Sequence, residues 1–254
     1  MRISVTLRAA TLLCFLSLLF SCSTNYTIVQ SRRAEYPIQA GGVVDSSVIK
    51  KYLPYKLKMD SQMNQVIGYT DVALTKKYVH GESLLGNFFS DAALYEAKLI
   101  DPQIDFALPS TNGGLRNDLP LGPLTLSNVF ELMPFENEMM IFELKGADVK
   151  ELIDLIANSG GQPVSGITMK IVDKKAQDIL IKGVPFDSTK NYRVLTSDYI
   201  AGGGDGVNCF KNPVTRKVVG LKVRDALIKY IKDTQATGKK ITSKTDGRIT
   251  NDQP

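Results

Sequence analysis

The chain has 254 residues, of which 43% are hydrophobic and 22% charged, and its formal net charge is +5 with no tryptophan. This is ordinary globular material, enough for one sizeable core or for a domain with a long lead-in. The small excess of basic residues gives no indication of nucleic-acid binding.

The first 21 residues predict a lipoprotein signal peptide. Arg2 and Arg8 precede an apolar run, residues 9–20, that is too short and wrongly flanked for a membrane span. The run leads into Ser21-Cys22, which resembles the bacterial lipobox, where the cysteine receives diacylglycerol. We therefore predict an exported protein anchored through lipidated Cys22 to a bacterial cell membrane, facing the periplasm or the cell surface. A normally cleaved signal peptide with an incidental cysteine is the alternative.

Residues 22–44 mix polar, basic and glycine residues without sustained periodicity, so we interpret them as a tether. The folded domain is expected over residues 45–252. Cys14 lies in the signal peptide and Cys22 is assigned to the lipid, which leaves only Cys209. An intramolecular disulfide is therefore excluded.

The domain begins with apolar residues near helical spacing over 45–63, where Pro54 should kink or end the first part. A short strand at 66–72 and a strongly apolar helix at 82–98 follow. The later elements alternate between the two types: a strand at 104–108, a helix at 126–133, a strand at 139–144, a helix at 147–157, strands at 167–172, 179–181 and 192–197, and a helix at 221–234. This order predicts an α/β or α+β domain.

The first candidate site is the loop Ser110–Arg116, directly after a predicted strand. Gly113 and Gly114 allow a close approach of the backbone to a ligand, and Arg116 can donate paired hydrogen bonds to a phosphate or a ribose. A glycine turn beside an exposed arginine is the simpler interpretation of this segment alone.

Two further loops carry aromatic rings next to polar groups. In the segment 133–137, Phe135 can stack on a flat heterocycle and Asn137 can read its edge, although this segment taken alone favours a core position for Phe135. In the segment 199–206, Asp205 can accept hydrogen bonds from two sugar hydroxyls beside the ring of Tyr199, or the segment is simply a glycine-rich turn. It matches neither a Walker loop nor the dinucleotide fingerprint.

Taken together, these segments resemble the C-terminal domain of the 5′-nucleotidase family. The resemblance runs from about Asp45 to Ile249 and includes the motif Glu82-Ser83-Leu84-Leu85-Gly86-Asn87, the loop 111–116, Pro134-Phe135 and the segment 203–206. It implies a layered α/β/β/α sandwich in which two mixed sheets face each other between helices.

The resemblance also implies roles for individual residues. Two aromatic rings clamp the nucleobase in that family, and Phe135 matches the first, whereas Tyr199 stands where phenylalanine is usual. Asp205 matches an aspartate that binds the ribose hydroxyls, and Arg116 matches an arginine on the phosphate side. The resemblance places five further residues at the substrate: Asn137, Asn112, Gly113, Gly114 and Gly160.

The chain departs from the family in two ways. Thr111 replaces the usual loop asparagine, although Asn112 is adjacent, and lysines at 76–77 stand where many members have phosphate-holding arginines. The family's hydrolysis belongs to an N-terminal metallophosphatase domain with two divalent metals, whose histidine motifs are absent here. His80 is the single histidine, and we interpret it as a surface residue. We predict no catalytic residues, metal site or cofactor in this chain.

The leading hypothesis is a lipoprotein that binds a nucleoside or nucleotide as the substrate-binding half of a split 5′-nucleotidase. A separate metallophosphatase chain would then carry the divalent metals. Two alternatives remain open: a surface lipoprotein that captures nucleosides without a catalytic partner, and a degenerate module that keeps the fold and binds nothing.

Overall fold

The computed structural model describes residue 26, residues 30–37 and residues 45–251. The predicted signal peptide, the lipidation site Cys22 and much of the tether lie outside the described residues. The chain divides into two units, 1–49 and 50–254, and, apart from residues 46–49, every structural feature described below belongs to the second. In the part of the chain that the structure describes, no helix has the length and apolar character to cross a membrane.

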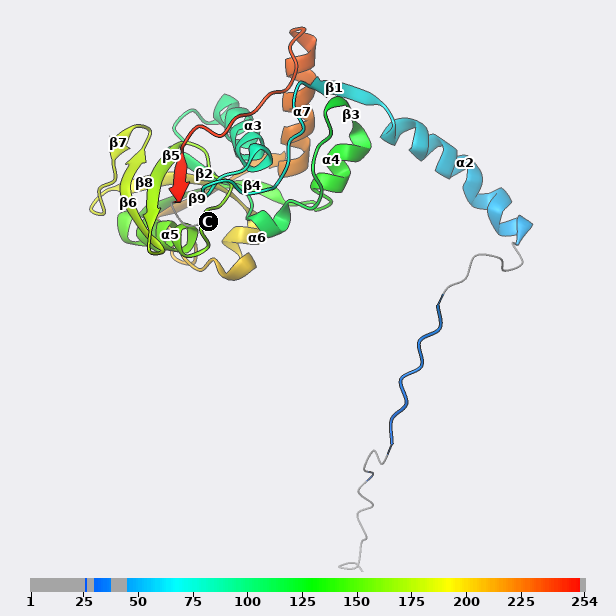
Figure 1. Ribbon diagram of the computed structural model, residues 1–254, viewed down its shortest axis with the longest axis horizontal. Helices are drawn as coiled ribbons and strands as arrows, with labels where there is room; N and C mark the ends of the chain where they lie inside the picture. The colour runs from blue at the N-terminus through cyan, green and yellow to red at the C-terminus, as the bar shows by residue number, and fades with distance from the viewer. Residues whose placement is uncertain (1–25, 27–29, 38–44, 252–254) are drawn as a thin grey trace, which may run out of the picture. The chain divides into compact units, whose positions relative to one another are not determined.

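Helices and strands alternate along the second unit as predicted (Figure 1). The helices are α2 (Ser46–Met63, which begins in the first unit), α3 (Leu84–Ile100), α4 (Leu126–Leu132), α5 (Gly146–Asn158), α6 (Asp198–Ala201) and α7 (Val223–Ala236). The strands are β1 (Val66–Thr70), β2 (Phe106–Leu108), β3 (Gly122–Thr125), β4 (Glu138–Lys145), β5 (Ile167–Val172), β6 (Lys175–Ile181), β7 (Val184–Pro185), β8 (Asn191–Ser197), β9 (Thr215–Lys222) and β10 (Ile249–Asn251).

The strands form two mixed four-stranded sheets, in the orders β2-β8-β4-β9 and β10-β5-β6-β7, and the two-stranded sheet β1-β3. In the first sheet, β2 runs parallel to β8, whereas β4 runs antiparallel to both of its neighbours. The second sheet contains one parallel pair, β10 with β5. The mixed α/β fold expected from the sequence is therefore confirmed.

The first sheet separates two hydrophobic cores. In the antiparallel β4-β8 pair, Ile141 lies opposite Leu195 and Phe142 lies opposite Val194. Since successive side chains of a strand point to opposite faces, these two cross-strand pairs enter different cores. Ile141 and Leu195 pack with residues of α3 and α7, which lie side by side (Figure 1). Phe142 and Val194 pack with α5 and with the second sheet.

Of the two outcomes predicted for Pro54, the end of the helix does not occur, because α2 continues through it. A proline inside a helix removes a single N–H donor, and the flanking turns keep their own hydrogen bonds. Helix α2 has no buried residue among its 18. Most of its large apolar side chains, including Tyr55 and Leu57, are exposed within the described chain.

Glu82, the first residue of the motif at 82–87, has a structural role. Its buried carboxylate accepts hydrogen bonds from the amide of Asn87 at 2.5 Å and from the backbone of Gly247 at 2.7 Å and Asp246 at 3.2 Å. The amide of Asn87 also donates to the carbonyl of Lys244 at 2.9 Å. This motif ties the start of α3 to the segment that leads into β10.

Removal of the Glu82 carboxylate should therefore destabilise the whole domain. We expect Glu82→Ala to lower the free energy of unfolding by about 3 kcal/mol, because it leaves three donors without their acceptor. Urea denaturation followed by circular dichroism measures the loss. Glu131→Ala, which removes an exposed carboxylate from α4, is the control and should change stability by less than about 0.5 kcal/mol. Equal stability of both variants would contradict this role.

Candidate ligand-binding site

Three predicted loops meet because of the strand directions in the first sheet. Since β2 and β8 are parallel, their carboxyl ends lie at the same edge, and the antiparallel β4 begins there. The loop after β2 carries Gly113, the segment before β4 carries Phe135, and the segment after β8 carries Tyr199 and Asp205.

A cavity of about 290 Å³ lies where these loops meet. It is lined by Ser110, Gly113, Gly114, Arg116, Phe135, Asn137, Tyr199 and Asp205. Seven of the nine predicted substrate residues are among them, and Ser110 is an addition that the sequence reasoning did not single out. The rings of Phe135 and Tyr199 are 40% and 50% exposed, so neither is a core residue.

Asn112 and Gly160, which were also predicted at the substrate, do not line this cavity. The side chain of Asn112 accepts a hydrogen bond from the hydroxyl of Tyr78 and donates to the carbonyl of Gly161 at 3.3 Å. Gly160 occupies the turn after α5 with φ of 78°. Asn112 therefore connects its loop to the 160–162 turn, and the carbonyl of Gly160 accepts a hydrogen bond from the side chain of Asn251 at 3.3 Å.

Asp205 is held by two hydroxyl groups. The Tyr199 hydroxyl donates to its Oδ1 at 3.0 Å, and the Thr111 hydroxyl donates to its Oδ2. The hydrogen bond from Tyr199 and the negative charge of Asp205 raise the pKa of the Tyr199 phenol. Thr111 was noted only as a departure from the family pattern, yet it contacts the residue predicted to bind the ribose.

Arg116 is an exposed residue that lines the cavity. Its backbone N–H donates to the carbonyl of Leu132 at 2.9 Å, and one guanidinium nitrogen donates to the carbonyl of Gly113 at 3.2 Å. The second contact leaves most of the five guanidinium donors available to an anion. Arg116 takes part in none of the ion pairs found among the described residues.

The Phe135 loop (residues 133–137) is held in place by Arg224, a buried residue of α7 that was not predicted from the sequence. Its guanidinium group donates to the carbonyls of Met133 at 3.4 Å and Phe135 at 3.3 Å and to the carboxylate of Glu136. It also lies 4.1 Å from the centre of the Phe130 ring, which is cation–π geometry. Arg224 therefore connects the end of α4 to the Phe135 loop.

Glu136 should make this loop sensitive to acid. Hydrogen bonds from Lys222 and then Arg224 lower the pKa of Glu136 from 4.5 to about 2. Because the folded-state pKa is depressed, the stabilisation is present above pH 4.5 and is lost as the pH falls toward 2. We expect the stability difference between the wild type and Glu136→Gln to shrink over this interval, as measured by urea denaturation at stepped pH. A difference that stays constant from about pH 6 to about pH 2 would contradict the assignment.

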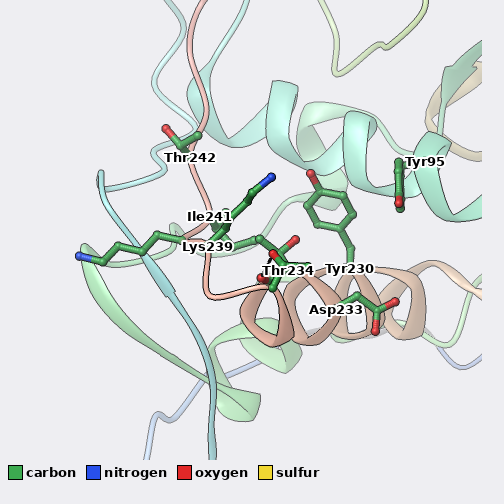
Figure 2. Close-up of a pocket in the computed structure, with 9 residues that line it drawn as sticks. Tyr95, Tyr230, Asp233, Thr234, Lys239, Ile241 and Thr242 are labelled. Atoms are coloured by element: carbon green, nitrogen blue, oxygen red, sulfur yellow. Dashed lines mark hydrogen bonds between the residues drawn. The ribbon is translucent and has the colours of Figure 1, made fainter.

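A larger cavity of about 400 Å³ lies elsewhere, between α3, the end of α7 and the segment 239–242 (Figure 2). It is lined by tyrosine rings, threonine hydroxyls and lysines, including Tyr95 and Tyr230, whose ring centres are 5.4 Å apart in an edge-to-face arrangement. None of the predicted site residues lines it. The larger of these two cavities is therefore not the one that the predicted residues line.

Comparisons with known proteins match the same region of the chain. The family model described as "5′-nucleotidase, C-terminal domain" matches residues 66–212. The cell wall protein Lmo0130 of Listeria monocytogenes is 31% identical over 184 residues, which cover 66% of this chain and 23% of that protein. The trifunctional nucleotide phosphoesterase protein YfkN of Bacillus subtilis is 30% identical over 215 residues, covering 77% and 14%.

Among solved structures, a 5′-nucleotidase precursor from Thermus thermophilus matches with a TM-score of 0.68 and 27% identity. The match covers 81% of this chain and 43% of that one. The chain thus spans less than half the length of each of these three relatives.

Proposed function

Because the chain belongs to the 5′-nucleotidase C-terminal domain family, we propose that it binds a nucleoside or nucleotide in the cavity between Phe135 and Tyr199. The observation that carries the proposal is that both rings, Asp205 and Arg116 line one cavity although they come from three separate segments of the chain. Aromatic rings stack on nucleobases, a carboxylate accepts from sugar hydroxyls, and a guanidinium group binds phosphate. Nucleobase, sugar and phosphate are the three chemical parts of a nucleotide.

We further propose that hydrolysis needs a second chain. Within the described residues, no group of three or more histidine, cysteine, aspartate or glutamate side chains is placed to hold a metal ion. The proposal therefore assigns the divalent metals and the activated water to a separate metallophosphatase, to which this chain presents its ligand.

Helix α2 is the surface best suited to dock that chain. Its exposed apolar side chains include Tyr52, Tyr55 and Met59, and four lysines against one aspartate make residues 50–60 basic. The family match begins at residue 66, directly after α2. The matched family is a C-terminal domain, so the remainder of a longer relative would approach from this side. We propose an acidic, partly apolar partner surface here, and the lipid anchor at Cys22 would hold both chains at the membrane.

Binding is tested by calorimetric titration of the chain from Ser23 onward with adenosine and with AMP. We expect dissociation constants of roughly 1–100 µM, which correspond to about −8 to −5.5 kcal/mol. Tighter binding of AMP than of adenosine would support a phosphate contact by Arg116. No heat with either ligand would leave the family membership in place and favour a module that binds nothing.

The division of labour is tested by an AMP hydrolysis assay with added Mn²⁺. The chain alone should release no phosphate above the level of a buffer blank. Hydrolysis by the chain alone, at a rate comparable to that of a two-domain 5′-nucleotidase, would overturn the split arrangement. Ligand binding without any metallophosphatase that docks to α2 would instead favour the nucleoside-capturing lipoprotein.

A further inference from the structure

Asp205 occupies an unusual backbone position in the segment Gly203–Gly206. Its φ of 53° and ψ of 25° lie in the left-handed region, and the flanking Gly203 and Gly206 also have positive φ values of 98° and 79°. Aspartate adopts the left-handed region more often than most residues with a Cβ atom, because its short side chain can form local hydrogen bonds. The carboxylate of Asp205 accepts hydrogen bonds from the hydroxyls of Tyr199 and Thr111.

The Tyr199 ring is fixed on the same segment. A Cβ atom on Gly204 would lie 2.5 Å from Cε1 and 2.6 Å from Cζ of this ring, so the ring packs directly on the glycine backbone. This contact places the phenol oxygen beside Asp205, where its 3.0 Å hydrogen bond reaches Oδ1. A phenylalanine at this position would keep the ring contact and lose only the hydrogen bond.

Thr111, in the loop after β2, binds the second carboxylate oxygen of Asp205. Its hydroxyl donates to Oδ2 of Asp205. A Cβ atom on Gly113 would lie 3.6 Å from the Thr111 hydroxyl and 3.9 Å from Oδ2, so the glycine loop closes over this pair in ordinary contact. The two hydroxyls therefore fix both oxygens of one carboxylate that faces the cavity.

A carboxylate offers about four acceptor positions, two on each oxygen. With one position on each oxygen already filled, Asp205 retains one open position on Oδ1 and one on Oδ2. We infer that the hydroxyls of Tyr199 and Thr111 preset Asp205 to accept one donor on each oxygen, and that these two residues make the cavity selective for ligands with two adjacent hydroxyls. The inference rests on the proposed function and assigns ribonucleosides, rather than 2′-deoxyribonucleosides, as the preferred class.

The selectivity arises from the fixed orientation of the carboxylate. A ribonucleoside donates to both open positions at once without reorienting Asp205, whereas a 2′-deoxyribonucleoside can donate to only one. If either hydroxyl is removed, the carboxylate can turn and receive a single donor equally well. The variants should therefore lose discrimination between the two sugars, beyond any general loss of affinity.

The test is a calorimetric titration of adenosine and 2′-deoxyadenosine into the wild type, Tyr199→Phe, Thr111→Val and Thr111→Ser. The first two variants remove one hydroxyl each, and the last keeps it as a matched control. We expect the wild type to prefer adenosine at least about tenfold, Tyr199→Phe and Thr111→Val to reduce this ratio about threefold or more, and Thr111→Ser to retain it. Thermal unfolding of each variant verifies that the fold is kept.

The outcomes separate the two proposals. A wild type that binds neither nucleoside refutes both the binding function and the inference. A wild type that binds adenosine, with a selectivity ratio unchanged in Tyr199→Phe and Thr111→Val, overturns the inference alone. A ratio that rises in either variant also overturns it, because the hydroxyls would then compete with the ligand for Asp205.

Discussion

Asp205→Ala should weaken adenosine binding by a factor of about 100 or more. Each hydrogen bond to a charged acceptor contributes about 1.5–3 kcal/mol, and the ligand is expected to donate two of them to Asp205. The substitution also leaves the hydroxyls of Tyr199 and Thr111 without their shared acceptor. Calorimetric titration measures the loss of affinity.

Asp154→Ala is the control for this experiment. Its carboxylate lies on α5 and pairs with Lys150, with 45% of the Asp154 side chain exposed. An exposed pair of this kind contributes at most about 1 kcal/mol to stability and should leave adenosine affinity unchanged. If Asp205→Ala bound adenosine as tightly as Asp154→Ala, the cavity would not be the binding site.

Arg224→Ala should be the most destabilising substitution near the site, at about 3 kcal/mol. It removes a buried cation from two carbonyls and from the face of the Phe130 ring, and it leaves the Glu136 carboxylate without its buried partner. Because the lost contacts hold the Phe135 loop, adenosine affinity should fall as well. Urea denaturation and calorimetry measure the two effects on the same samples.

Lys222→Ala separates the effect of the buried Arg224 contacts from the effect of pairing the Glu136 charge. Lys222 pairs with the same Glu136 carboxylate but is 37% exposed. We expect it to destabilise the domain much less than Arg224→Ala does and to leave adenosine affinity close to that of the wild type. Equal losses of stability and affinity in Lys222→Ala and Arg224→Ala would show that the charge on Glu136, and not the buried Arg224 contacts, holds the Phe135 loop in position.

Elements with strong local patterns were predictable from the sequence. The helix expected at 82–98 is α3 at Leu84–Ile100, and the strand expected at 167–172 is β5. The strands β3, β7, β9 and β10 and the short helix α6 were missed. Strand β9 is largely exposed and rich in basic residues, and β10 is a short strand that pairs with β5, far earlier in the chain. Such strands depend on long-range pairing, which local periodicity does not report.

The site was predictable to the extent that each loop carried its own chemical signature. Phe135, Tyr199 and Asp205 were recognisable as aromatic or acidic residues in glycine- or proline-containing segments, and the structure brings them to one cavity. The supporting contacts were not predictable. Arg224 lies in an ordinary helical pattern, and its effect on the loop is visible only when α7 packs against α4.

The final strand has a consequence for the ligand loops. The backbone N–H of Asn251 donates to the carbonyl of His80 at 2.8 Å. The next residue, Gly81, packs tightly on Gly161: a Cβ atom on Gly161 would lie 2.0 Å from the Gly81 carbonyl oxygen. Gly161 in turn accepts a hydrogen bond from Asn112 in the loop that carries Thr111. Residues 249–251 are therefore not a dispensable tail: proteolytic trimming at this point would loosen the cavity lined by Phe135, Tyr199 and Asp205 without touching any residue that lines it.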